Sequence, residues 1–522
     1  MSNNDNEMKI NSGAGSDCGS FRKEERVCGV RGECSRDFVL PDYMGDIKRL
    51  LKYSASLTPC NKFLSGRDVS LLGIVTFKVL YLDGEDRLTE ASFTSDFEHT
   101  EKMSYDFIDA GAEMRVQSVA VRLAGPRKIS AKASVATDIY TVTEGELQDR
   151  SMFESAETKK TKIKIHSAEY CGGSEREYAE EIDRLADILA DEIEVIKYDA
   201  VAHIDSVYPT DSGVNLSGYA DAFCLLRVGD EIMRLEKRIP IEEGIETEKY
   251  GTDNEYHPKA TVTGVTLNVN NATDEKDTGE CAASVVMNMS VECGVTRHYN
   301  EEYDVVTDAF LEGRECSVEY RDFSYREMLG SVCEKAKISM VAPRGEEVLH
   351  GIFDWDAAVR NVKCEAGESE MKISCDLCVT LAAKGSEAED CYPKKIEEPI
   401  SLSYKINGLN ESSEISVSVV PCEVSPSFDS EKIYVECYIL VRALAEATKC
   451  ERIVFTLASG EEERGCERCV HVYYTEREDT LWSVAKKYRI SPAKIVKQNL
   501  SAALPENMEN NISSVPKIII AK

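Results

Sequence analysis

Long apolar segments are absent from this sequence of 522 residues, and no stretch approaches the about 18 consecutive apolar residues of a membrane-spanning helix. The first residues, MSNNDNEMKINSGAGSDCGS, also lack an apolar run behind basic residues, which is the mark of a secretory signal. We therefore expect no transmembrane segment and no signal peptide. The protein is expected to stay in the cytoplasm in which it is made.

Catalytic signatures are missing as well. The sequence has no glycine-rich phosphate loop ending in Lys-Ser/Thr, no His-Glu-x-x-His and no Gly-x-Ser-x-Gly, and its 7 histidines are isolated from one another. We expect that the protein is not an enzyme and that it needs no cofactor.

Basic residues are scarce relative to acidic ones: 62 Lys and Arg stand against 94 Asp and Glu, for a net charge of -32. A field of that sign repels phosphate backbones and anionic lipids, so nucleic acid is not expected as a partner. The exception is residues 470–522, which carry a net charge of +3 while the rest of the chain carries -35. The end of the chain therefore differs electrostatically from everything before it.

Cysteine is plentiful, but the 19 residues are odd in number and scattered, which favours free thiols in a reducing cytosol over a disulfide framework. Two Cys-x-x-Cys pairs, Cys375 with Cys378 and Cys466 with Cys469, could together bind zinc. The first pair lies in a segment that reads as a strand, where positions i and i+3 point to opposite faces. We therefore expect no metal site, with these four cysteines as a weak candidate.

The chain is too long for one hydrophobic core, because single cores stop growing at about 250–300 residues. Apolar residues make up 42% and charged residues 30%, which is ordinary globular composition. Residues 1–24 are rich in Ser, Asn, Gly and Asp and lack apolar periodicity, so they are predicted to be a disordered tail. The remainder is expected to form several folded domains.

One pattern of strands occurs three times. The segment DVSLLGIVTFKVLYLDGED from Asp68 has counterparts in GVNLSGYADAFCLLRVGDE from Gly213 and, more faintly, in EMKISCDLCVTLAAKGSEAE from Glu370. Each is followed by two alternating segments joined by a polar turn, typical of an antiparallel hairpin with one buried face. We predict a mainly β multidomain protein with antiparallel repeats at 25–150, 151–310 and 311–458, then a linker at 459–469.

Two segments ahead of these strands read as helices. YMGDIKRL at residues 43–50 and YAEEIDRL at residues 178–185 share the same spacing of tyrosine, isoleucine, arginine and leucine. The second continues with apolar residues at i, i+3, i+4 and i+8 up to Ile193, which is a helical stripe. We therefore predict some helix within the repeats.

Residues 470–522 form a module of their own, predicted as strand, helix, helix, strand. VHVYYT alternates as a strand, and Asp479 or Thr480 is placed to cap the following helix. Apolar residues then recur at helical spacing: Leu481, Val484, Ala485 and Tyr488. Ser491 and Pro492 suit the start of a second short helix, and KIIIA supplies a returning strand.

This module resembles the LysM domain, a small α+β (βααβ) fold. The residues that match its usual pattern are Tyr474, Thr475, Asp479, Thr480, Leu481, Val484, Ala485, Tyr488 and Asn499. The resemblance implies a shallow groove for N-acetylglucosamine-containing glycans, between the strand-to-helix loop and the loop after the second helix. Candidate groove residues are Glu478, Asp479, Thr480, Leu481, Trp482, Asn499 and Pro516.

Two features depart from the LysM pattern. Glu478 stands where the family usually has glycine, and only Pro516 and Lys517 remain of the usual turn before the last strand. The LysM fold is thus compatible with a changed ligand.

The order of three β-rich repeats and one LysM module resembles the SPOCS-plus-LysM proteins of spore-forming Clostridia. That resemblance implies a scaffold in spore coat assembly, in the mother-cell cytoplasm at the forespore surface, with a SpoIVA-like coat ATPase as partner. The competing interpretation is a peptidoglycan-binding protein of the cell wall or spore cortex. Self-association is left open.

The module carries five basic residues on its helices: Lys486, Lys487, Arg489, Lys494 and Lys497. They form either a solvated helix face, a docking surface for an acidic partner, or a contact with the acidic repeats of the same chain. Trp482, one of only 2 tryptophans, is either a core residue or an exposed binding anchor.

Overall fold

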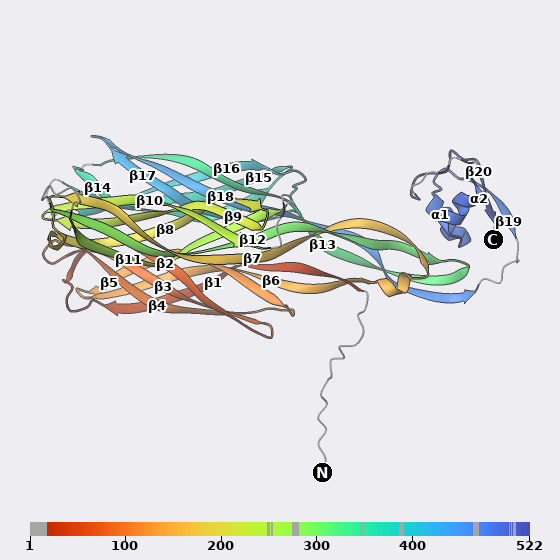
Figure 1. Ribbon diagram of the computed structural model, residues 1–522, viewed down its shortest axis with the longest axis horizontal. Helices are drawn as coiled ribbons and strands as arrows, with labels where there is room; N and C mark the ends of the chain where they lie inside the picture. Colours follow the sequence, from red (N-terminus) through yellow and green to blue (C-terminus); the bar gives the residue numbers. More distant parts are fainter. Residues whose placement is uncertain are drawn as a thin grey trace, which may run out of the picture.

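The computed structural model describes residues 18–247, 251, 254–273, 281–345, 348–385, 391–462, 469–500, 502, 504 and 508–521. Strands occupy most of the described chain, and all the paired strands are antiparallel, as the sequence predicts. They form three sandwiches of two three-stranded sheets each, which together make the β body of the molecule (Figure 1). None of the helices among the described residues is long and apolar enough to cross a membrane.

The strands follow the same order in each sandwich. The first contains β1 (Cys18–Val39), β2 (Ile47–Ser65), β3 (Asp68–Asp83), β4 (Leu88–Lys102), β5 (Asp109–Gly125) and β6 (Lys128–Asp149). The second contains β7 (Ala156–Ala186), β8 (Ile193–Thr210), β9 (Gly213–Val228), β10 (Glu231–Glu246), β11 (Glu255–Thr273) and β12 (Cys281–Leu311). The third contains β13 (Arg314–Pro343), β14 (Gly351–Ala366), β15 (Glu370–Lys384), β16 (Cys391–Lys405), β17 (Glu414–Phe428) and β18 (Lys432–Glu462). Two short 3₁₀ turns, η1 (Arg150–Phe153) and η2 (Ala190–Glu192), flank β7.

In each sandwich one sheet is a simple meander and the other closes the unit. The meanders are β2-β3-β4, β8-β9-β10 and β14-β15-β16, with the three repeated sequence segments as their central strands. The second sheets pair the first strand of the repeat with its last, in the orders β1-β6-β5, β11-β12-β7 and β13-β18-β17. Strand β1 begins seven residues inside the predicted tail, and β18 continues into the first residues of the predicted linker.

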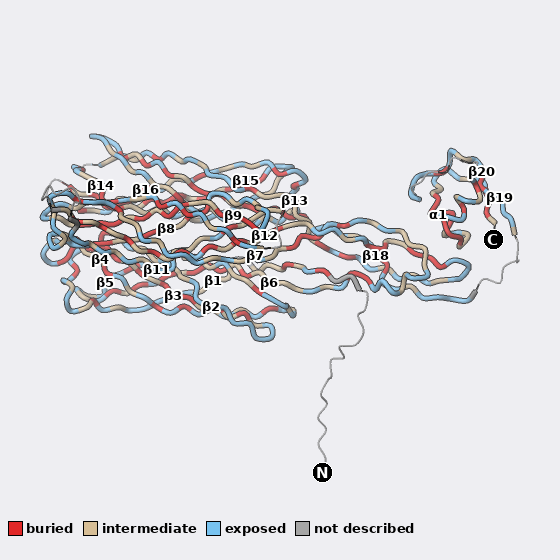
Figure 2. Tube along the Cα trace, viewed as in Figure 1, coloured by how far each residue is buried: buried red, intermediate tan, exposed pale blue. Residues whose placement is uncertain are grey.

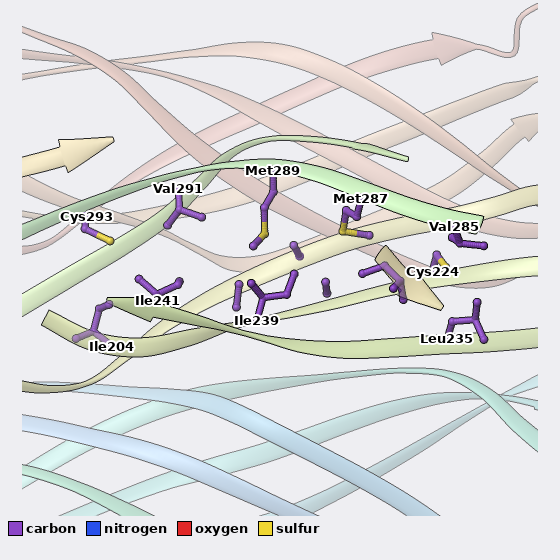
Figure 3. Close-up of a cluster of buried hydrophobic side chains, with 14 of the residues drawn as sticks. Ile204, Cys224, Leu235, Ile239, Ile241, Val285, Met287, Met289, Val291 and Cys293 are labelled. Carbon is purple, nitrogen blue, oxygen red and sulfur yellow. The ribbon is translucent and has the colours of Figure 1, made fainter. Parts of the chain in front are cut away.

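The core of each sandwich lies between its two sheets. In the second sandwich, Met287 and Met289 of β12 face Ile239 of β10 across the buried layer (Figure 3). The period-2 alternation of the sequence places these residues inside and the polar residues between them outside.

The three sandwiches meet at a shared centre formed by equivalent strands. β2, β8 and β14 carry a bulge at the same register position, where Leu51, Ile196 and Phe353 are the extra residues. All three bulged residues belong to one apolar cluster. A bulge bends its strand and redirects its side chains, so the repeated bulge turns one residue of every sandwich toward the other two.

Next to each bulged residue lies a buried charged group. Lys52 and Lys197 place their Nζ atoms 2.8 and 3.0 Å from the carboxylate of Asp354, which is 0% exposed. Arg234 donates to the other oxygen of that carboxylate at 2.9 Å. These groups come from three different sandwiches, and separating the sandwiches would leave buried charge uncompensated. The network therefore favours the arrangement in which all three sandwiches are in contact.

The prediction of helices within the repeats is wrong. Residues 43–50 form a turn and the start of β2, and residues 178–185 lie within β7. In β7 the register shifts at Ile182, so Ile182 and Leu185, three positions apart, are both buried. Bulges in strands thus produced the spacing that resembles a helix, because an extra residue moves the alternation by one position.

The far ends of β7, β12, β13 and β18 extend beyond the sandwich cores as a narrowing stalk (Figures 1 and 2). Its tip, residues 308–316, contains the turn between β12 and β13. Gly313 in that turn has φ +65°, a conformation that glycine adopts without strain. The closing module lies at this tip.

Candidate binding module at the stalk tip

The module is built in the predicted order of strand, helix, helix and strand. Its elements are β19 (Val470–Tyr474), α1 (Leu481–Tyr488), α2 (Pro492–Gln498) and β20 (Lys517–Ala521). Thr480 caps α1 by accepting a hydrogen bond from the Ser483 N–H at 3.0 Å. Pro492 opens α2 at the first helical position, where its missing N–H costs nothing.

The residues predicted to line a glycan groove fall into three groups. Leu481, Trp482 and Asn499 are buried, Asp479 and Thr480 are partly buried, and Glu478 and Pro516 are exposed. The Asp479 carboxylate accepts hydrogen bonds from the Tyr473 hydroxyl at 2.8 Å and the Glu476 N–H at 2.7 Å. The Asn499 amide bonds the backbone of Ile519. Several residues of the LysM-like pattern therefore hold the module itself together.

The two loops that would flank the groove are joined where the structure describes them. The Trp482 N–H donates to the Met508 carbonyl at 3.0 Å, and the Ile512 N–H donates to the Asp479 carbonyl at 2.9 Å. Thr480 also forms a β-bridge with Asn511. The chain after α2 is thus bonded to the strand-to-helix loop.

The module contacts the stalk tip through α1 and the start of α2. Phe310 of β12 belongs to the apolar cluster of the module, and its ring centroid lies 5.2 Å from that of Trp482. The Trp482 Nε1–H donates to Asp308 at 2.9 Å. Trp482 is therefore an internal anchor between module and body.

Three of the five basic residues predicted on the helices face acidic groups of the stalk tip. Lys486 lies 2.6 Å from Asp308, and the Arg489 guanidinium lies 3.1 Å from Glu315. Lys494 lies 2.8 Å from Glu312. For Lys486, Arg489 and Lys494, the alternative that the structure shows is the contact with acidic residues of the same chain.

A backbone bond completes this docking contact. The Gly313 N–H donates to the Arg489 carbonyl at 3.0 Å, and Arg489, at φ +53°, ends α1 in the left-handed region. The contact joins a turn in the body to a helix end in the module, both of which have backbone groups without partners in their own element.

Asp308 is the centre of the contact. Burial disfavours its charged form, but hydrogen bonds from Lys486 and Trp482 outweigh that effect and hold its pKa below the ordinary value. Lys486 is also partly buried, yet the bond to Asp308 raises the pKa of its ammonium group. Both groups are charged at neutral pH and attract one another. The sequence marked the basic side of this contact but not its acidic side, because acidic residues are common throughout the chain.

The cysteines of the weak zinc candidate do not come together as far as the structure describes them. Cys375 and Cys378 are buried in β15, where burial raises the pKa of both thiols and disfavours thiolate. Cys466 lies outside the described residues, and Cys469 is partly exposed beside β19. Among the described residues no group of three or more His, Cys, Asp and Glu side chains could hold a metal ion.

A cavity of about 520 Å³ lies between the sandwiches of the β body. Its lining includes His257 and His298, whose ring centroids are 4.3 Å apart, together with Arg26 and Arg442. His298 also lies 3.2 Å from His166, which bonds Glu446 at 2.6 Å. Burial lowers the pKa of His257 to about 4 and lowers that of His298 as well, so both rings are neutral at pH 7.

No protein-family model, curated protein or solved structure matches this chain.

Proposed function

We propose that this protein is a non-enzymatic adaptor in spore coat assembly, in which the LysM-like module binds a coat-assembly protein such as a SpoIVA-like ATPase. The order of repeats and module in the sequence supports this function by resemblance. The proposed place of action is the mother-cell cytoplasm at the forespore surface.

The observation that carries the proposal is the docked module. The contacts of Trp482, Lys486 and Arg489 with the stalk tip hold the module at one end of a long β body. A module held in one orientation presents the same surface to every partner and loses less entropy on binding than a freely tethered one. The body can then bind other coat components or further copies of itself at a set distance from the module.

Peptidoglycan binding is the competing function. The burial of Leu481, Trp482 and Asn499 and the joined loops weigh against an open glycan groove, because a shallow groove needs exposed polar groups to recognise a sugar. The protein-binding function agrees better with this geometry.

The experiment is deletion of the gene in the source organism, followed by electron microscopy of sporulating cells. The adaptor function predicts coat material that forms but fails to attach around the forespore, with an intact cortex. Complementation with full-length protein should restore attachment. A normal coat over a defective cortex would contradict the proposal and favour the peptidoglycan function.

A further inference from the structure

The two strands of the module differ in how their outer edges are covered. On β20, the Asn499 side-chain amide donates to the Ile519 carbonyl at 2.6 Å and accepts from the Ile519 N–H at 2.6 Å. The Gln498 amide makes the same two bonds with Ala521, each at 2.9 Å. These two side chains occupy the place of a neighbouring strand, so the outer edge of β20 is closed.

This covering fixes the direction of the backbone groups in β19. In an antiparallel pair, opposed residues alternate between those that exchange hydrogen bonds and those whose backbone groups point outward. The backbone N–H and C=O groups of Ile519 and Ala521 point away from β19. Val472 and Val470 lie opposite them, so their backbone groups point away from β20, toward the outer edge of β19. Tyr474 is two residues beyond Val472, so its backbone groups also point toward the outer edge. The hydrogen bond from the Thr475 N–H to the Pro516 carbonyl agrees, because Thr475 is one of the alternate residues that bond across the pair.

The outer edge of β19 is therefore an open row of hydrogen-bonding groups. No bond within the described ranges uses the N–H or C=O groups of Val470, Val472 or Tyr474. Their side chains are exposed too, at 67%, 53% and 71%, and Ile519 beside Val472 is 46% exposed. Native proteins usually protect such an edge with charge, proline or a bulge, because an open apolar edge recruits another strand.

The charge around this edge indicates which strand would fit. Lys487 lies over the Tyr473 ring at 4.9 Å, on the face of the sheet opposite to Val472 and Tyr474. Lys517 lies opposite Tyr474 in the ladder and shares the face of Tyr474. Both lysines are exposed, and neither has a carboxylate partner in the part of the chain that the structure describes. A second copy of the module would bring like charge to this edge, whereas an acidic strand would complement it.

We propose that the outer edge of β19 binds an extended segment of a partner protein in which apolar residues alternate with acidic ones. The segment would add a strand to the β19–β20 sheet, with its apolar residues on the face of Val472 and Tyr474 and its carboxylates on the other face, near Lys487. β19 lies on the side of the module away from the body and α1 on the side toward it, so docking leaves the edge accessible (Figure 1). The identity of the partner as a coat protein rests on the proposed function, but the edge site does not.

The test uses the full chain and a fluorescent synthetic peptide of alternating valine and glutamate, with a valine–lysine peptide as control. Binding is followed by anisotropy in the wild type and in Val472→Pro. Proline removes the outward N–H of Val472 and no bond to β20, and it is tolerated at an edge position. We expect the acidic peptide to bind the wild type at least tenfold more tightly than it binds Val472→Pro, and the basic peptide to bind neither.

A second variant, Val472→Glu, keeps the backbone donor but places a negative charge in the apolar stripe, and it should weaken binding of the acidic peptide in the same way. Val341→Glu, at an exposed valine of β13, is the matched control and should bind like the wild type. Equal affinity of the acidic peptide for wild type and both Val472 variants would overturn the proposal. So would a wild-type dimer in sedimentation that becomes monomeric in Val472→Pro, because a second copy would then occupy the edge. A normal coat in the deletion strain would refute the proposed function without changing these affinities.

Discussion

At the scale of single residues, Asp308 explains why a basic module remains on an acidic body. Its carboxylate accepts from the indole of Trp482, the ammonium of Lys486 and the hydroxyl of Tyr320. Each of these donors is partly shielded from water, so water cannot fully replace the Asp308 carboxylate as its hydrogen-bond acceptor. The docking contact is therefore most sensitive at this one side chain.

Replacing Asp308 by alanine should release the module. The change leaves the indole N–H of Trp482 and the ammonium group of Lys486 without their acceptor. We expect this to destabilise the docked state by about 2 kcal/mol, which corresponds to a roughly 30-fold larger fraction of undocked module. Faster hydrogen exchange in α1 and at the stalk tip would report the opening. Asp304→Ala, at an exposed position of the same strand, should leave exchange unchanged. Equal protection in both variants would show that Asp308 does not hold the module.

Histidine 257 should make stability depend on pH. Its pKa in the folded protein, about 4, lies below the ordinary 6.5, so the folded state binds fewer protons than the unfolded state between these values. The contribution of His257 to the free energy of unfolding is therefore fully present above pH 6.5. It decreases as the pH falls toward 4, by up to about 1.4 kcal/mol per pH unit. Urea unfolding midpoints at pH 7 and pH 5 measure the slope.

His257→Gln should reduce that slope, leaving the share of His298, whose pKa is lowered in the same direction. His350→Gln controls for the loss of an exposed histidine. An unchanged slope in His257→Gln would contradict the burial argument.

The candidate groove residues illustrate what the sequence could predict at this scale. Capping preference offered Asp479 or Thr480 as the helix cap, and Thr480 caps α1. Helical spacing correctly placed Leu481 in an apolar face. It did not reveal that Trp482 packs on Phe310, because a contact between residues 172 positions apart depends on how the module sits on the body. The glycan-binding role of these residues stays a prediction.

At the scale of elements, turns and bulges decide where strands end and which way they face. The hairpin of β12 and β13 needs a residue with positive φ at Gly313, and the same residue donates a hydrogen bond to the module. The bulges of β2, β8 and β14 aim side chains at the shared centre. Local alternation in the sequence predicted the hairpins, but the bulges broke that alternation and gave segments that resembled helices.

Replacing Gly313 by alanine should cost about 1 kcal/mol, because alanine is strained at positive φ. The same change should also increase hydrogen exchange in α1, since the turn carries the bond to Arg489. Gly84→Ala is the matched control: Gly84 lies in the turn after β3, it does not have positive φ, and an added Cβ meets no atom within 4 Å. Thermal unfolding of the two variants compares them, and equal losses would argue against a role for backbone conformation at Gly313.

At the scale of the whole molecule, the three sandwiches form one body because they share a buried centre. No single repeat contains a complete set of partners: Lys52 comes from the first, Lys197 and Arg234 from the second, and Asp354 from the third. The three repeats were visible in the sequence as repeated strands. Their assembly around one carboxylate was not, because nothing in a single sequence distinguishes a buried aspartate from the many exposed ones.

Asp354→Ala should destabilise the whole body by about 3–5 kcal/mol, because it leaves Lys52, Lys197 and Arg234 buried without their shared acceptor. Glu365→Ala, at an exposed position of the same strand, should cost about 1 kcal/mol or less. Urea unfolding of both variants measures the difference. Similar losses in the two variants would mean that the centre does not hold the sandwiches together.

The proposed function requires that the docked module binds a coat-assembly protein and not glycan. The most direct measurement is a paired binding assay with the purified full-length protein, against the SpoIVA-like coat ATPase of the same organism and against purified peptidoglycan. We expect saturable binding to the ATPase, weakened in Val472→Pro, and no retention on peptidoglycan above that of a control protein of similar charge. Retention on peptidoglycan without binding to the ATPase would contradict the proposed function.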